Sequence, residues 1–187
     1  IVICLVLLLA AFPLGAMPSV YAESVDMLSE KELKENFGLV SSFKLVGTAN
    51  YKKARQAYTE INAARTKAGK SQLKLDGALT KAAMQRAAEC AVLFSALRPD
   101  CSDYTTVLSG KGVYAQCIAT NSPSAEEIVA AWMDSATDKA VILDKSNKKF
   151  RSIGIGAFKA ADTYYWCLLV SSQDRQEKLT YTTAKNN

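Results

Sequence analysis

Two strand-like segments near the C-terminal end constrain the fold of this chain more than any other feature of its sequence. Residues 151–160 (RSIGIGAFKA) and 163–172 (TYYWCLLVSS) have the composition of β-strands, and only Ala161 and Asp162 separate them. A two-residue connection between two such runs is typical of a β-hairpin. The sequence therefore predicts an antiparallel hairpin at this end of the chain.

The segments before the hairpin predict helices. In residues 51–70, small or apolar side chains recur every three or four positions, which is the period of one helix face, and Gly69 is placed to end that helix. Asp76 is a suitable N-cap for a second helix, which we expect to end at Arg98-Pro99-Asp100. The expected apolar face of the second helix consists of Leu79, Ala83, Ala87, Cys90 and Phe94.

A third helix is predicted after a polar connection. Residues 113–119 (VYAQCIA) have a strand's composition, and Ser124 with Glu127 then forms a capping-box pattern at the start of a helix that runs through Trp132 to Ser135. Three or four helices around a small, largely antiparallel sheet make an α+β fold.

The N-terminal residues 1–22 are uncharged and begin with twelve apolar residues, which Pro13 interrupts. This pattern, ending in Val-x-Ala at Ala22, predicts a secretory signal peptide that is cleaved after Ala22. The alternative is an uncleaved membrane anchor. With cleavage we expect a secreted or extracellular protein without a membrane span. Its organisation would be a lead-in or stalk at 23–50, one domain at 51–172 and a polar tail at 173–187.

Charge and composition exclude several classes of function. The chain of 187 residues carries 23 Lys and Arg against 18 Asp and Glu, without the concentrated basic run that nucleic-acid binders usually have, so we expect no nucleic-acid partner. There is no histidine. That absence excludes imidazole-based acid–base catalysis, Ser-His and Cys-His nucleophile pairs, and zinc sites that need imidazole.

Six segments, taken together, resemble the CAP superfamily, which includes the cysteine-rich secretory proteins, venom antigens and plant pathogenesis-related proteins with their bacterial relatives. They occur in the family's order: INAARTKAGKSQLKLDGALTKAAMQRAAE, FSALRPD, VYAQCIA, SAEEIVAAWMDSATDKAVIL, SIGIGAF and YYWCLLV. The resemblance is to the bacterial type. It implies a three-layer α-β-α sandwich, secreted or displayed at a surface, with a cleft across its sheet.

Three positions depart from the pattern that the resemblance implies for the cleft. Ala96 stands in place of a histidine, Gln116 in place of a glutamate, and Asp138 in place of a second histidine. Alanine offers no lone pair, an amide does not titrate, and a single carboxylate is no dedicated metal site. We therefore predict a degenerate cleft with no catalytic residue, no metal and no cofactor. Arg98 and Trp132 are candidates for lining it, although a structural role for Arg98 and a core position for Trp132 are the simpler interpretations.

The cysteines suggest disulfides. Four remain after signal cleavage, an even number in an exported chain, and they allow three connectivities. Cys101 and Cys117 stand where the family pattern has a glycine and an asparagine beside the cleft, which suggests a bond between them. Cys90 and Cys167 either form a second bond or remain buried thiols, and Cys90 with Cys101 is the competing pair. A four-cysteine zinc site is the remaining alternative.

These observations lead to three hypotheses about function. The preferred one is a secreted, non-catalytic CAP domain that binds a small apolar ligand such as a lipid or sterol, a peptide, or a component of the cell envelope. The second is a hydrolase that pairs Asp138 with Asp100 or Glu127. The third is a structural or adhesive protein held at the membrane by an uncleaved N-terminus.

Overall fold

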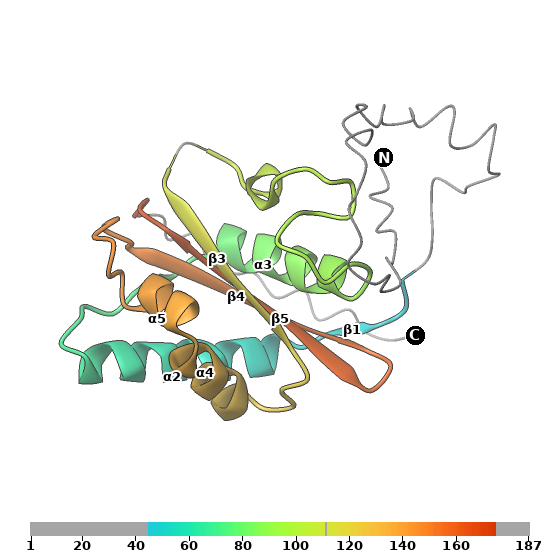
Figure 1. The fold of residues 1–187 in the computed structure, drawn as a ribbon, viewed down its shortest axis with the longest axis horizontal. Helices are drawn as coiled ribbons and strands as arrows, with labels where there is room; N and C mark the ends of the chain where they lie inside the picture. The colour runs from blue at the N-terminus through green and yellow to red at the C-terminus, as the bar shows by residue number, and fades with distance from the viewer. Residues whose placement is uncertain (1–44, 111, 175–187) are drawn as a thin grey trace, which may run out of the picture.

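A five-stranded sheet lies between two layers of helices in the computed structural model, which describes residues 45–110 and 112–174 (Figure 1). Helix α3 covers one face of the sheet, and α2, α4 and α5 cover the other. The elements are β1 (Thr48–Ala49), α2 (Tyr51–Lys67), β2 (Lys74–Leu75), α3 (Gly77–Cys90), the 3₁₀ turn η1 (Tyr104–Val107), β3 (Tyr114–Thr120), α4 (Ala125–Asp134), α5 (Ala136–Ile142), β4 (Ser152–Ala160) and β5 (Thr163–Ser171). The predicted α+β fold with an α-β-α sandwich is confirmed.

The predicted hairpin forms the centre of the sheet. Strands β4 and β5 pair antiparallel from Ser152 opposite Ser171 to Ala160 opposite Thr163, so Ala161 and Asp162 make a two-residue turn. Strand β3 pairs antiparallel with the outer edge of β5, and β1 pairs antiparallel with β4. Only the short β2 runs parallel to its neighbour, β4. The sheet is therefore largely antiparallel, and β3 is its edge strand on the β5 side.

The predicted helix starts are confirmed by their caps. The Asp76 side chain accepts a hydrogen bond from the backbone N–H of Leu79 at 2.8 Å, and the Ser124 hydroxyl accepts one from the N–H of Glu127 at 3.1 Å. Helix α2 ends at Lys67, and Gly69 follows with a φ of 68°, a conformation that glycine adopts without steric cost.

One predicted helix end is wrong and one is confirmed. Helix α3 ends at Cys90 rather than near Arg98, and Phe94 lies in the following loop with half of its surface exposed. Helix α4 ends as predicted at Ser135, which also caps the short helix α5 by accepting a hydrogen bond from the N–H of Asp138. The early end of α3 has a physical cause, because Arg86 of that helix binds the carbonyls of the next loop.

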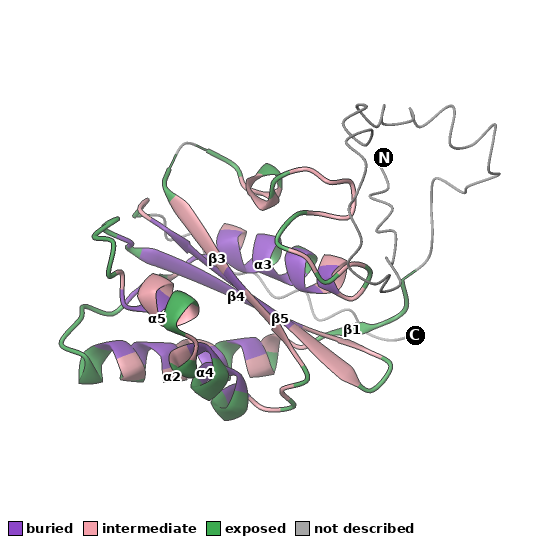
Figure 2. Cartoon of the chain, viewed as in Figure 1, coloured by how far each residue is buried: buried purple, intermediate pink, exposed green. Residues whose placement is uncertain are grey.

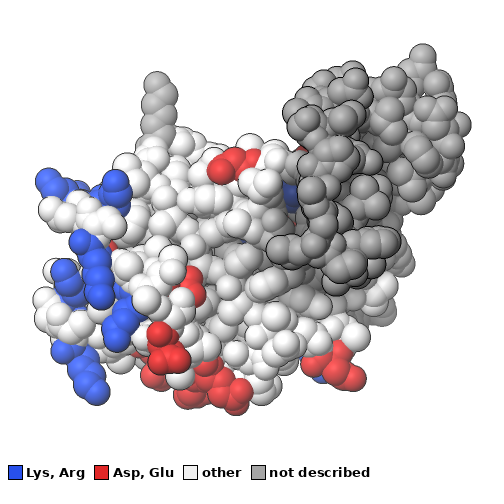
Figure 3. Space-filling model, viewed as in Figure 1, with Lys and Arg blue, Asp and Glu red and all other residues white. Residues whose placement is uncertain are grey.

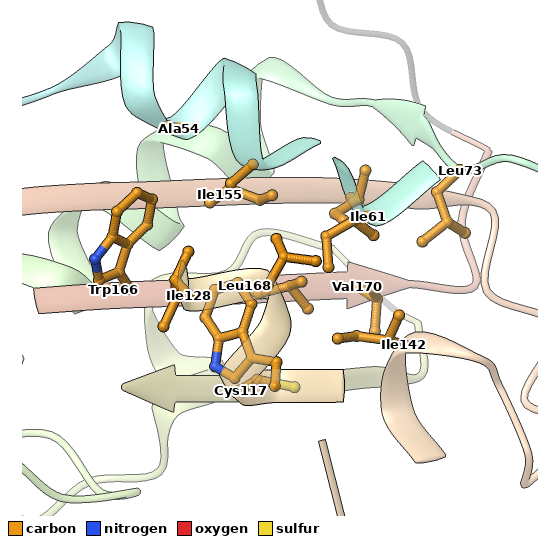
Figure 4. Packing of buried hydrophobic residues seen from close by; sticks show 14 of the residues in the cluster. Ala54, Ile61, Leu73, Cys117, Ile128, Ile142, Ile155, Trp166, Leu168 and Val170 are labelled. Atoms are coloured by element: carbon orange, nitrogen blue, oxygen red, sulfur yellow. The ribbon is translucent and has the colours of Figure 1, made fainter. Parts of the chain in front are cut away.

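The core consists of two hydrophobic clusters, one on each face of the sheet. Figure 2 shows buried residues along β4, β5 and the helices on both sides of the sheet. The larger cluster lies under α2, α4 and α5, and its labelled members in Figure 4 include Ile61, Cys117, Ile128 and Trp166. The smaller cluster lies under α3. Both tryptophans are core residues, since Trp132 is 1% exposed and Trp166 is fully buried.

Two glycines of β4 bring α3 into direct contact with the sheet. A Cβ atom added at Gly154 would overlap the backbone of Leu79 and Thr80, and one added at Gly156 would overlap the backbone of Ala83 and Met84. The sequence SIGIGAF thus leaves room for a helix that packs backbone to backbone against the strand.

Several predictions lie outside the described residues. The signal peptide at 1–22, most of the lead-in at 23–50 and nearly all of the tail at 173–187 belong to parts on which the structure gives no information. In the segments 45–110 and 112–174, none of the helices combines the length and the apolar character that crossing a bilayer requires.

Candidate functional site

Arg86 is a fully buried cation on α3, and its guanidinium organises the region that the sequence marks as the degenerate cleft. Its Nη1 donates to Glu89 Oε2 at 2.7 Å, and its Nη2 donates to the carbonyls of Ser95 at 3.0 Å and Leu97 at 3.3 Å. Its Nε points to Gln116 Oε1 at 3.5 Å. One side chain therefore connects the helix, the loop after it and strand β3.

Gln116 and Ala96, two of the three positions that depart from the family pattern, are in contact through a hydrogen bond. Gln116 projects from β3, and its Nε2 donates a hydrogen bond to the Ala96 carbonyl at 2.7 Å. Its Oε1 faces Arg86, so both ends of the amide contact groups of the protein. An amide suits this place because it donates to a carbonyl at one end and accepts at the other, whereas a carboxylate has no proton to donate.

Glu89 joins Arg86 to a second cation, the guanidinium of Arg98. Arg98 Nη2 donates to Glu89 Oε1 at 2.7 Å, and the Arg98 side chain also lies 4.0 Å from the Asp100 carboxylate. Burial by itself would raise the pKa of Glu89, but hydrogen bonds from Arg98, Arg86 and Gln85 outweigh it and hold the pKa below its ordinary value. The hydrogen bond to Glu89 in turn raises the pKa of Arg98.

We call the side chains of Arg86, Glu89, Arg98 and Gln116, with the carbonyls of residues 95–97, the Arg86 network. Arg98 belongs to it through its ion pair with Glu89. Trp132 does not: it lies in the larger core cluster, under the helices of the opposite face. The proposal that Trp132 lines the cleft is corrected by this placement.

Asp138 is not part of the Arg86 network. It lies on α5, where its backbone carbonyl is 4.0 Å from Cys117 Sγ. Adjacent residues of a strand point to opposite faces, so Gln116 faces Arg86 while Cys117 faces the α5 side. The three departures from the family pattern therefore divide into a pair, Ala96 and Gln116, and a separate residue.

The carboxylates of the hydrolase hypothesis are engaged elsewhere. Asp100 accepts hydrogen bonds from the Ser102 hydroxyl at 2.6 Å and the Ser102 N–H at 3.0 Å, and these bonds lower its pKa. A carboxyl held in its ionised form is unsuited to act as a general acid. The Glu127 carboxylate accepts a hydrogen bond from the Ser124 hydroxyl at the start of α4.

The predicted disulfides are not present in the structure, in which Cys90, Cys117 and Cys167 are free thiols. The Cys101–Cys117 bond fails for a geometric reason. Cys101 belongs to the loop on the Arg86 side, whereas Cys117 points into the larger core cluster on the other face (Figure 4). Burial raises the pKa of the Cys117 thiol far above its usual range.

Cys90, the last residue of α3, and Cys167, in the core cluster under that helix, are both buried, so the alternative of two buried thiols describes them. Each is near enough to Arg86 and Glu89 for those charges to affect its pKa, and burial raises the pKa of both thiols. A four-cysteine zinc site is inconsistent with cysteines on two faces of the sheet. Over residues 45–110 and 112–174, no three Cys, Asp or Glu side chains gather as metal ligands.

A small cavity lies away from the Arg86 network, near the start of α3 and the turn η1. Its lining includes Leu79, Val107, Tyr114 and the buried carboxylate of Asp76. Asp76 Oδ2 has no hydrogen-bond partner among the described atoms. Buried oxygens of this kind are usually satisfied by ordered water.

Residues 58–171 match the sequence model of the cysteine-rich secretory protein family, CAP, which is more than half of the 187 residues. The chain belongs to the CAP family. None of the curated proteins matches this CAP chain in sequence.

Solved structures share the CAP fold. An outer surface protein from Borrelia burgdorferi aligns with a TM-score of 0.60 at 17% identity, over 70% of this chain and 100% of that one. An extracellular SCP-domain protein from Bacillus anthracis gives 0.57 at 16% identity, over 66% of this chain and 41% of that one. A cysteine-rich secretory protein from Staphylococcus aureus gives 0.51 at 18%, over 78% and 50%.

These neighbours are named as extracellular, secretory or outer-surface proteins. The chain spans the whole of the Borrelia structure and half or less of the other two. At identities under 20% the likeness concerns the fold.

Sequence reasoning missed Arg86 and Glu89, the two residues at the centre of the site. A signal was present, because Arg86 falls between Ala83 and Cys90 on the predicted apolar face of α3, and Glu89 follows at the i+3 spacing of a helical ion pair. A charged residue within an apolar stripe indicates a buried partner.

Proposed function

We propose that this CAP domain is a secreted, non-catalytic binding domain. The observation that carries the proposal is the Arg86 network, in which a permanently charged, fully buried guanidinium occupies the predicted cleft region. A guanidinium remains protonated under physiological conditions, so it serves neither as a general base nor as a metal ligand. It also repels the divalent cation that a site with imidazoles and a carboxylate would hold.

The groups around Arg86 are already engaged in binding one another. Glu89 is bound by two arginines, Gln116 by Arg86 and the Ala96 carbonyl, and the carbonyls of the loop by Arg86. A catalytic centre needs polar groups that are directed at substrate and change protonation state during the reaction. The polar groups of the Arg86 network are instead bound to one another.

The exposed side chains of the loop that follows α3 favour a partner with an apolar part. Val92, Phe94 and Leu97 are 41%, 50% and 44% exposed, and Leu97 adjoins the Arg86 network through its carbonyl. Exposed apolar residues that gather in one loop often mark an interaction site. We therefore propose binding of a lipid, sterol or apolar peptide segment, as presented by a cell-envelope component. The predicted signal at 1–22 and the extracellular neighbours support secretion.

The proposal is tested by titrating the exported protein with a fluorescent fatty acid and a fluorescent sterol. We expect Phe94→Ser to weaken binding by about tenfold, because it removes most of an aromatic contact surface. The matched pair Val92→Ser and Val46→Ser tests whether the position of the valine matters for binding. Val92 lies in the loop, whereas Val46 lies near β1 and is 75% exposed. Equal effects of the two valine substitutions would contradict a role for the loop.

The non-catalytic part of the proposal has its own test. Turnover should be absent when the protein is incubated with peptide and ester libraries. Activity that disappears in Asp138→Asn and persists in Asp134→Asn would overturn the proposal in favour of a hydrolase.

A further inference from the structure

Two loops that are distant in the sequence form one surface at the end of the molecule opposite the loop after α3 (Figure 1). One loop follows α2, and the other connects α5 to β4. Arg65, which is 4% exposed, joins them by donating from Nε to the Ser71 carbonyl at 2.9 Å and from Nη1 to the Ile142 carbonyl. The N–H of Lys74 also donates to the Arg151 carbonyl at 2.9 Å.

This surface carries exposed cations from both loops, and Figure 3 shows them gathered on one side of the molecule. We call it the basic end, and it consists of Lys67, Lys70, Lys145, Lys148, Lys149 and Arg151. None of these side chains forms an ion pair with a carboxylate of residues 45–110 or 112–174. A concentration of like charges that form no ion pairs is electrostatically unfavourable and attracts anions.

The loop between α5 and β4 holds its lysines in a defined conformation. Asp144, Asn147 and Lys149 have φ values of 49°, 53° and 59°, which L-residues seldom adopt. The Asp144 carboxylate fixes this path by accepting hydrogen bonds from the N–H groups of Lys148 at 2.7 Å and Phe150 at 3.2 Å. The Asp144 carboxylate therefore binds backbone N–H groups of its own loop, and the neighbouring lysine ammonium groups stay exposed.

We infer that the basic end binds an anionic polymer of the cell envelope that carries a phosphate on each repeat unit. Six separate exposed cations, one at the end of α2 and five on the two loops, suit a chain of repeating charges better than one small anion, which requires convergent donors in a pocket. Acidic side chains gather over α4, beside the basic end, so that positive charge is concentrated at one end of the molecule and can orient it toward a polyanion (Figure 3).

A polymer fits this surface better than a bilayer does. Electrostatic binding to membranes is usually reinforced by apolar side chains that insert between lipids. Among the described residues the exposed large hydrophobic side chains are Leu45, Val46, Val92, Phe94, Leu97 and Val113, and both loops of the basic end lack one. The inference goes beyond the proposed function, since it concerns a different surface and does not require the loop after α3.

The test uses synthetic poly(glycerol phosphate) as the probe, with binding to the full exported protein measured by fluorescence anisotropy over a range of NaCl concentrations. The combined substitution Lys145→Gln, Lys148→Gln and Lys149→Gln should weaken binding by about 100-fold. It should also make the salt dependence shallower by about two to three in log K against log[salt]. Bound polymer should protect Lys70 and Lys148 from acetylation.

The matched control removes the same net charge at Lys52, Arg55 and Lys81, which are exposed near the other end of α2 or on α3. We expect Lys52→Gln, Arg55→Gln and Lys81→Gln together to change the affinity by less than about threefold, since these sites lie outside the basic end. Equal losses in the two variants would overturn the inference, as would the absence of binding or tighter binding to anionic phospholipid vesicles than to the polymer. These outcomes leave the fatty-acid and sterol titrations unaffected, so the two proposals fail separately.

Discussion

At the scale of single residues, the identity of each side chain in the Arg86 network determines what this part of the domain can do. Arg86 exchanges water for the carbonyls of residues 95–97 and the carboxylate of Glu89, and Gln116 completes the contact to strand β3. Buried charges persist only where partners compensate them, because removing one partner leaves the other desolvated and unpaired. The network is therefore sensitive to substitution even though it performs no chemistry in our proposal.

Arg86→Met should lower the free energy of unfolding by about 3–5 kcal/mol, because Glu89 and the carbonyls of residues 95–97 lose their buried donor. Urea denaturation measures the loss. The control Lys81→Met lies on the same helix with an exposed side chain and should change stability by less than about 0.5 kcal/mol. A small loss in Arg86→Met would mean that the network is not coupled to folding.

The network also predicts a pH dependence. The pKa of Glu89 lies below its ordinary value of 4.5 in the folded protein, so its ionised form stabilises the fold above that pH. This contribution is lost as pH falls through the folded pKa. The unfolding free energy of the wild type should therefore decrease more steeply below pH 4.5 than that of Glu89→Gln. Parallel curves from chemical denaturation at several pH values would contradict this account.

At the scale of elements, the close packing of α3 on β4 positions Arg86 against the sheet. Gly154 and Gly156 remove the Cβ atoms that would otherwise separate the helix from the strand. The helix ends where Arg86 binds the following loop, so its length is set by tertiary contacts and not by helix propensity alone. The loop thereby presents Val92, Phe94 and Leu97 to solvent.

Gly156→Ala should destabilise the fold by about 1–3 kcal/mol, since its Cβ would overlap the backbone of Ala83 and Met84. Gly69→Ala is the matched control. No atom lies within 4 Å of a Cβ at that site, and only the cost of a positive φ, about 1 kcal/mol, should appear. In thermal unfolding, Gly69→Asn should be more stable than Gly69→Ala, because asparagine tolerates a positive φ. Gly156→Asn should be no more stable than Gly156→Ala, because the strain at that position is steric.

At the scale of the whole molecule, the sheet separates two chemically different sides. The Arg86 network and α3 lie on one face, and the larger core cluster with Cys117 lies on the other. The basic end and the apolar loop after α3 lie at opposite ends of the domain (Figure 1). This separation allows two partners to bind independently, as the two proposals require.

The separation of the faces also predicts the state of one cysteine. Cys117 should remain a thiol in the exported protein and should react with iodoacetamide only after unfolding, because burial raises its pKa and the thiolate is the reactive form. Peptide mass spectrometry under non-reducing conditions measures both properties. A crosslinked peptide that joins Cys101 to Cys117 would show that the loop and the strand adopt a different arrangement.

The sequence by itself determined the elements and the family. Periodic apolar positions, the caps at Asp76 and Ser124, and the two-residue break at Ala161 and Asp162 are local signals, because capping and turn geometry depend on neighbouring residues. The family's segments in order identified the fold. The resemblance to the family, and not local reasoning, assigned Ala96 and Gln116 to one cleft.

Tertiary structure decided the rest. The buried partner of Arg86, the early end of α3, the separation of Asp138 from Gln116 and the assembly of the basic end from two loops all join residues distant in the sequence. Strand alternation explains why adjacent residues such as Gln116 and Cys117 belong to different faces, but only the packed sheet shows which face each one occupies. Burial and pairing arise when elements pack, and a one-dimensional pattern does not contain those distances.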